Sequence, residues 1–204
     1  PPVLDIRDFD TVFFDYEYGK GDVDKAFADA DKIYEEEFET GYQEQAYLET
    51  QGMIAEPGAD KMTVHGSMQC PYYVHGAVMR ALGYSASQVQ IKQDVTGGGF
   101  GGKEAFPSIL ACQTAVAAKK AGRPVRVIFE RREDMEFTSK RHPSLCKYKA
   151  AVKDGVVTAM DIDVLFNGGA YTTLSAVVLQ RGIICANGVY NIPNLHVRGR
   201  AVKT

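Results

Sequence analysis

The six residues 97–102 contain five glycines, interrupted only by Phe100. Because glycine has no Cβ, such a run permits positive φ and lets the backbone approach another group closely. Residues 89–95 alternate apolar and polar side chains as in a half-buried strand, and residues 104–121 have the spacing of a helix. The order of strand, glycine loop and helix N-terminus directs several backbone N–H groups at one point, which favours binding of a phosphate or another anion.

Two common motifs can be laid over this loop. Gly97, Gly102 and Lys103 fit the phosphate-binding pattern G-x-x-x-x-G-K, but Glu104 replaces the Ser or Thr that would hold magnesium, and its carboxylate would repel a triphosphate. The glycines also fit G-x-G-x-x-G, so a NAD- or FAD-binding module is one alternative, with Glu130 after the next strand as the ribose-binding acid. A purely structural glycine turn is the other alternative.

The composition is that of an ordinary globular protein, with 45% hydrophobic and 24% charged residues. No apolar stretch reaches the roughly 18 residues of a membrane span. The chain starts at Pro1 without an initiator Met or a signal-peptide pattern, so we expect a fragment, residues 1–204, of a longer polypeptide. Four scattered cysteines without a C-x-x-C pair favour reduced thiols in the cytoplasm and argue against a zinc or iron–sulfur cluster held by this segment.

The net charge of -3 conceals an asymmetry. Residues 1–60 carry 17 acids and 4 bases, a net -13, whereas residues 61–204 carry 9 acids and 19 bases, a net +10. We therefore distinguish an acidic lead-in with the first strands, about 1–60, from a glycine-loop core, about 61–204. The basic part would favour an anionic cofactor, although a solvated face is the simpler explanation. The bases are not interleaved with aromatic residues, so nucleic-acid binding is not expected.

Periodicity predicts an α+β fold with mixed and antiparallel sheets and helices packed on one face, a two-layer arrangement. Strands are expected at 11–18, 32–40, 52–56, 61–67, 89–95, 125–130, 147–153, 156–166 and after 194. Helices are expected after Asp22 and over 71–82, 104–121 and 173–185, the third with its apolar face formed by Phe106, Ile109, Cys112 and Val116. Asp154-Gly155 is the clearest hairpin turn.

Several stretches, taken together in their order and spacing, carry more information than the glycine loop alone. They are Tyr47-Leu48-Glu49-Thr50, Ser67-Met68-Gln69, residues 97–104, Gly122-Arg123-Pro124-Val125, Arg141-His142-Pro143 and Tyr190-Asn191-Ile192-Pro193-Asn194. Over nearly its whole length the chain resembles the molybdenum-binding (molybdopterin) subunit of the xanthine dehydrogenase and aldehyde oxidase family, of the purine type.

The resemblance implies a molybdenum hydroxylase that inserts a water-derived oxygen into a C–H bond of a purine such as xanthine or hypoxanthine. The metal would be held by the dithiolene of a pyranopterin, possibly with an appended cytosine nucleotide, and not by protein side chains. Electrons would pass to 2Fe-2S clusters and FAD on other domains or subunits. The remainder of the molybdenum subunit would be a further partner. An aldehyde or another N-heterocycle is the alternative substrate within this family.

The resemblance also assigns roles to residues. Gln69 matches the glutamine that hydrogen-bonds an oxygen ligand of molybdenum, and Gly99, Phe100 and Gly101 match the loop whose backbone approaches the metal centre. Glu104 and Arg181 match the substrate-pocket pair of purine-type members. The simpler alternatives are a favourable acid at a helix N-terminus for Glu104 and a buried ion-pair partner for Arg181. The family's general-base glutamate would lie beyond Thr204, so we expect the isolated segment to be inactive.

Overall fold

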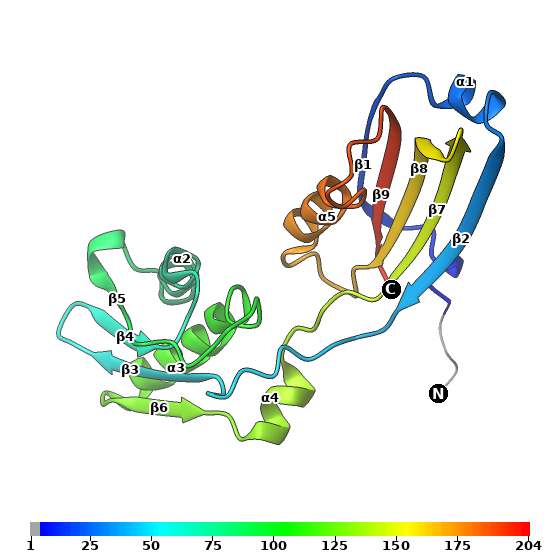
Figure 1. Cartoon of the computed structure of the whole chain (residues 1–204). Coiled ribbons are helices and arrows are strands. Elements are labelled where there is room, and N and C mark those ends of the chain that lie inside the picture. The colour runs from blue at the N-terminus through cyan, green and yellow to red at the C-terminus, as the bar shows by residue number, and fades with distance from the viewer. Residues whose placement is uncertain (1–4) are drawn as a thin grey trace. The chain divides into compact units, whose positions relative to one another are not determined.

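The computed structural model describes residues 5–204, which form two compact units (Figure 1). The first unit contains the described residues up to Tyr42 together with His142–Thr204, and the second contains Gln43–Arg141. The change of charge near residue 60 falls inside the second unit and does not coincide with the division between the units. The first four residues of the expected lead-in lie outside the described part of the chain.

The first unit is built on a five-stranded sheet in the order β1-β9-β8-β7-β2. Its strands are β1 (Val12–Lys20), β2 (Lys32–Thr40), β7 (Ser144–Lys153), β8 (Val156–Asn167) and β9 (Asn194–Val202). All pairs are antiparallel except β8 with β9. The β7–β8 hairpin turns at Asp154-Gly155, where both residues have positive φ, and this confirms the predicted turn.

Helix α5 (Ser175–Ile184) connects the parallel strands β8 and β9, as a parallel connection requires. Its Leu179 and Ile183 pack on one face of the sheet, in a core that includes Ile162 and Val197. Helix α1 (Val23–Ala28) contacts β8, β9 and β7. Asp22 caps it as predicted, because its carboxylate accepts a hydrogen bond from the Lys25 amide at 3.0 Å.

The second unit contains a four-stranded sheet in the order β5-β4-β3-β6. Its strands are β3 (Gly52–Pro57), β4 (Met62–Gly66), β5 (Val89–Gln93) and β6 (Val125–Ile128). Helix α2 (Pro71–Leu82) and the short helix η2 (Ala86–Gln88) connect the parallel strands β4 and β5, and helix α3 (Phe106–Ala121) packs on α2 and β3. The predicted α+β class with mixed sheets is confirmed.

Helix α3 buries a different face from the one predicted. Ile109 and Val116 are 52% and 46% exposed, whereas the buried positions are Pro107, Leu110, Ala111, Thr114, Ala115 and Ala118. Small side chains let α3 lie close to its neighbours, so selecting the larger apolar residues misplaced its buried face. Helix α3 also begins at Phe106 and not at Glu104.

Residues 131–137, for which the sequence predicts no element, form helix α4 (Arg131–Phe137). Its N-terminus is closed by a capping box, in which the Glu130 amide donates to the Glu133 carboxylate at 2.9 Å. Glu130 therefore caps a helix and is not placed as the ribose-binding acid of the dinucleotide alternative.

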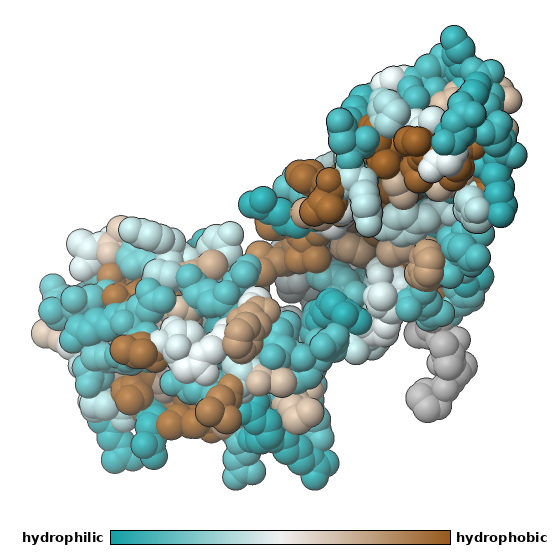
Figure 2. Space-filling view, viewed as in Figure 1, coloured by the Kyte–Doolittle hydropathy of each residue, from teal (hydrophilic) through white to brown (hydrophobic). Residues whose placement is uncertain are grey.

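On the face shown in Figure 2, each unit is largely polar, with smaller apolar patches between hydrophilic side chains. The acid run on β2 belongs to this solvated surface, because eight of the nine residues of that strand are exposed. Within residues 5–204, no helix is both long and apolar enough to cross a bilayer.

Candidate functional site

The glycine loop lies between β5 and α3. At some of its positions the backbone conformation requires glycine. Gly98 and Gly101 have φ of 95° and 91°, which side chains rarely tolerate. Phe100 also has a positive φ, 51°, although it carries a side chain, and that side chain is 76% exposed. Non-glycine residues in the left-handed region cost about 1–2 kcal/mol each. Such strain around an exposed aromatic residue is typical of a functional loop.

Gln69 lies directly against this loop, at the junction between β4 and α2. Its side-chain oxygen accepts hydrogen bonds from the backbone N–H groups of Gly101 and Lys103, both at 3.1 Å. The backbone N–H of Gln69 donates to the Lys103 carbonyl at 2.7 Å. Because two donors bind the oxygen, the orientation of the carboxamide is fixed and its NH₂ group remains to donate elsewhere.

Gly99 permits this approach. An added Cβ at this position would lie 2.4 Å from the Gln69 side-chain oxygen. The structure thus brings together Gln69, Gly99, Phe100 and Gly101, the four residues predicted to contact the cofactor.

A buried network of polar side chains is hydrogen-bonded to the backbone of the loop. Gln51 donates through its side-chain nitrogen to the Gly102 carbonyl at 2.8 Å and to the Tyr47 hydroxyl at 2.9 Å. The Asp134 carboxylate accepts from the Tyr47 hydroxyl and from the Gln51 amide, and all three side chains are fully buried. Burial, together with the hydrogen bond to Asp134, raises the pKa of Tyr47 to about 12. The hydroxyl therefore stays protonated as a donor at neutral pH.

Lys103 points inward and is fully buried, although it follows the glycines as a phosphate-binding lysine would. Its ammonium lies 2.7 Å from the Glu49 carboxylate and 3.0 Å from the Ser67 hydroxyl, and 4.9 Å from the centre of the Tyr47 ring. Burial of Glu49 opposes its ionisation, but hydrogen bonds from Lys103, Ser67 and Gly97 prevail and lower its pKa. Lys103 thus forms an ion pair inside the unit and is not exposed to bind a phosphate, which contradicts the G-x-x-x-x-G-K interpretation.

The topology also disagrees with a dinucleotide-binding fold. That fold needs a strand, the glycine loop, a helix and then a parallel strand in the same sheet. Here α3 leads into β6, which pairs antiparallel with β3 at the edge of the sheet opposite β5. The G-x-G-x-x-G spacing therefore occurs here without the parallel strand–helix–strand unit of a dinucleotide-binding fold.

The two predicted substrate residues lie on different units. Glu104 is half-buried, two residues before α3 begins, so it is not a first-turn acid of that helix. Its charge, after burial, contributes to the raised pKa of the neighbouring Cys70 thiol. Arg181 lies on α5 of the first unit and is exposed, which contradicts its alternative interpretation as a buried ion-pair partner.

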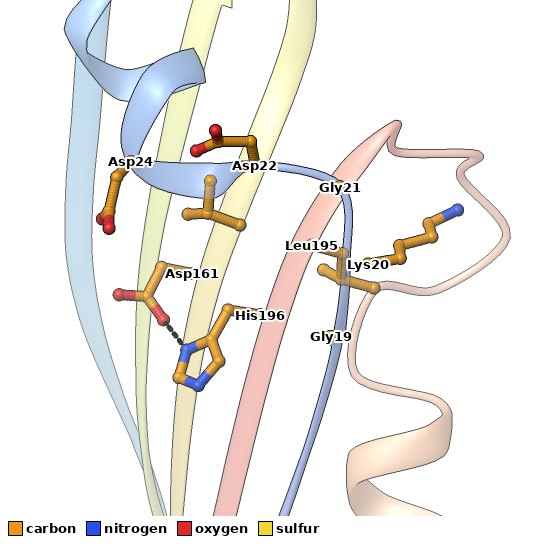
Figure 3. A pocket seen from close by; sticks show the side chains of 9 residues that line it. Gly19, Lys20, Gly21, Asp22, Asp24, Asp161, Leu195 and His196 are labelled. Carbon is orange, nitrogen blue, oxygen red and sulfur yellow. Dashed lines mark hydrogen bonds and ion pairs between the residues drawn. The ribbon is translucent and has the colours of Figure 1, made fainter.

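The first unit also contains an open pocket of about 630 Å³ beside α1 (Figure 3). One of its lining residues, His196, has both ring nitrogens hydrogen-bonded to carboxylates, Nδ1 to Asp161 at 2.6 Å and Nε2 to Glu17 at 2.9 Å. These hydrogen bonds raise the pKa of His196. Since both nitrogens are engaged, this histidine stabilises three strands and is not available as a base or ligand.

Comparisons with known proteins identify the family to which the chain belongs. The family model for the molybdopterin cofactor-binding domain matches residues 7–204. Aldehyde oxidase 3 of Mus musculus is 42% identical over 188 residues, and xanthine dehydrogenase of Emericella nidulans is 41% identical over 187 residues. These alignments cover 91% and 90% of this chain but only 14% of each relative.

A solved structure of aldehyde oxidoreductase from Desulfovibrio gigas superposes with a TM-score of 0.84 at 29% identity, over 95% of this chain and 22% of the other. The fold and the loop define a domain with a glycine-rich backbone segment packed against the fixed carboxamide of Gln69. The chain belongs to the molybdopterin cofactor-binding domain family of xanthine dehydrogenases and aldehyde oxidases. This result favours the molybdopterin interpretation over the dinucleotide alternative.

Tyr47 and Glu49 belong to one of the motifs that carry the family resemblance, but neither they nor Gln51 and Asp134 were predicted to be functional residues. The stretch at positions 47–51, Tyr-Leu-Glu-Thr-Gln, is mostly polar, so it gave no signal that Tyr47 and Gln51 are buried. Asp134 gave no signal, because its contacts with Tyr47 and Gln51 join residues more than 80 positions apart.

Proposed function

We propose that the second unit binds the pterin-held molybdenum cofactor at the glycine loop and Gln69, within a molybdenum hydroxylase that oxidises a purine. The observation that carries this proposal is the fixed carboxamide of Gln69 against a loop without Cβ atoms. Such a cofactor supplies two-electron redox chemistry that introduces a water-derived oxygen at a substrate C–H bond.

The loop has donors that fit an electron-rich ligand. Within residues 5–204 no acceptor binds the backbone N–H groups of Gly98, Gly99 and Phe100, although Gly99 is buried. Buried backbone N–H groups normally have a partner, and successive N–H groups in such turns form anion-binding concavities. With the NH₂ group of Gln69, the loop offers several donors, and residues 5–204 contain no group of three or more His, Cys, Asp or Glu side chains placed to hold a metal ion. That donor set fits a metal held by the dithiolene of its own pterin.

A purine substrate is the finer part of the proposal, and it rests on Glu104 and Arg181. A carboxylate accepts hydrogen bonds from ring N–H groups, and a guanidinium donates to purine C=O groups and stabilises negative charge that develops on the heterocycle. The relatives named above include both an aldehyde oxidase and a xanthine dehydrogenase, so an aldehyde or another N-heterocycle is the competing substrate class.

The experiment compares xanthine and an aromatic aldehyde as substrates of the native full-length protein, with a dye as electron acceptor. We expect xanthine turnover, and a loss of at least about tenfold in kcat/KM for Glu104→Ala and for Arg181→Ala, corresponding to one charged hydrogen bond each. Glu136→Ala is the matched control, because among residues 5–204 the Glu136 side chain forms only an exposed ion pair with Arg132. Aldehyde turnover that neither variant changes would contradict the purine assignment and leave the cofactor assignment in place.

The remaining parts of the proposal concern the whole protein. We infer that electrons leave through 2Fe-2S clusters and FAD on other domains or subunits. We also infer that the rest of the molybdenum subunit is a partner of this chain. The cysteines at positions 70, 112, 146 and 185 are free thiols in the structure, which supports a reducing compartment such as the cytoplasm. Analysis of the cofactor released on denaturation would show whether the pterin carries a cytosine nucleotide.

A further inference from the structure

Glu49 contacts both ends of the glycine loop. Its carboxylate oxygen Oε2 accepts from the backbone N–H of Gly97 at 2.8 Å, and the Gly97 carbonyl accepts from the Glu49 amide at 3.2 Å. The same Oε2 lies 2.7 Å from the ammonium of Lys103, the residue that follows the last glycine. One oxygen atom therefore joins the first residue of the loop to the residue that closes it.

The contact is built into the packing as well as the hydrogen bonds. A Cβ at Gly97 would lie 2.6 Å from the Glu49 Cβ, so this glycine is needed for the two segments to meet. The Lys103 side chain is fully buried, whereas that of Glu49 is 44% exposed. A buried ammonium depends on its carboxylate partner, because an unpaired charge in the interior is strongly destabilising.

We propose that Glu49 is a positioning residue that closes the glycine loop and holds the N–H groups of Gly98, Gly99 and Phe100 toward the cofactor. This inference rests on the proposed function of the loop. Gln69 fixes the second half of the loop through Gly101 and Lys103, and Glu49 fixes the first half through Gly97. Glu49 itself touches no reacting group in this account.

The competing explanation is that the pair of Glu49 and Lys103 only stabilises the unit. Three variants of the full-length protein separate the two: Glu49→Gln, Lys103→Met and the double variant. Glu49→Gln leaves a buried ammonium without a carboxylate, so it lowers the stability of the whole second unit. The double variant removes both charges, so it relieves that cost and still lacks the charged link across the loop.

The readouts are amide hydrogen exchange, measured in the loop and in β3, and molybdenum content by mass spectrometry. In the double variant we expect the hydrogen-bonded loop amides, those of Gly97, Gly101, Gly102 and Lys103, to exchange about tenfold faster, as the loss of one good hydrogen bond implies. Exchange in β3 should be unchanged, and less molybdenum should be retained. Glu136→Gln is the control and should leave both readouts at wild-type values.

Unchanged loop exchange in the double variant would overturn the inference, and so would equal acceleration in the loop and in β3. Wild-type molybdenum content in the double variant would also overturn it. If the wild-type protein itself contains no molybdenum, the proposed function fails, and the exchange of the loop relative to β3 still decides whether Glu49 closes it.

Discussion

Replacing Gly99 by alanine tests the contact between the loop and Gln69. The added Cβ would lie 2.4 Å from the Gln69 oxygen, and ordinary contact begins at 3.4 Å, so the oxygen must retreat by about 1.0 Å. The hydrogen bonds from Gly101 and Lys103, now 3.1 Å, would then lengthen to about 4 Å, beyond hydrogen-bonding distance. Gly99 does not have a positive φ, so backbone strain adds nothing.

The free energy of unfolding should fall by only about 1–3 kcal/mol, since two neutral hydrogen bonds of about 0.5–1.5 kcal/mol each are lost. The effect on cofactor binding should be larger, because the Gln69 carboxamide would leave the position in which we propose that it contacts the cofactor. The assay is molybdenum and pterin content of the purified full-length protein, with hydrogen exchange of the Gly101 and Lys103 amides.

Gly76→Ala is the matched control for this substitution. Gly76 lies inside α2, and an added Cβ would meet only the Arg80 guanidinium, at 3.4 Å. Alanine in a helix interior is favoured over glycine by about 0.5–1 kcal/mol, so this variant should be slightly more stable with unchanged cofactor content. If Gly99→Ala keeps wild-type molybdenum content and amide protection, the proposed contact does not position the cofactor and the reasoning is wrong.

Two further predictions concern stability. Tyr47→Phe removes the hydroxyl that donates to Asp134 and accepts from Gln51, so native-state hydrogen exchange should show the second unit destabilised by about 1.5–3 kcal/mol; no change would contradict the network. The pKa of His196 is raised in the folded state, so protonated His196 stabilises the folded protein. This contribution to the free energy of unfolding is complete below the ordinary pKa near 6.5 and is lost as the pH rises through the folded-state pKa. Thermal unfolding between pH 6 and 9 should show this loss in the wild type and a flatter profile in His196→Gln; equal profiles would contradict it.

Local signals predicted much of the fold. The helix over 71–82 has Pro71 in its first turn and ends at Gly83 in the left-handed conformation, as the sequence indicated. The Asp154-Gly155 hairpin was predicted for the same reason, that its residues determine its geometry. The buried face of α3 depends on what packs against it, so small residues such as Ala111 and Ala115 gave no signal of it.

The candidate site was predicted less completely. The glycine loop was visible from composition, but its partner Gln69 was assigned only through a family resemblance, since local sequence does not show which side chain approaches a loop. Lys103 could be interpreted as a phosphate ligand until the structure showed its side chain buried against Glu49. Asp134 could not have been found, because its role depends on contacts distant in sequence.

The most direct test of the central claim is elemental and cofactor analysis of the native full-length protein, with molybdenum measured by mass spectrometry and the released pterin identified on the same sample. The account predicts molybdenum and pterin in equal amounts, about one of each per chain, bound in a way that Gly99→Ala weakens. A folded full-length protein that contains neither would contradict the assignment of the glycine loop as a cofactor site.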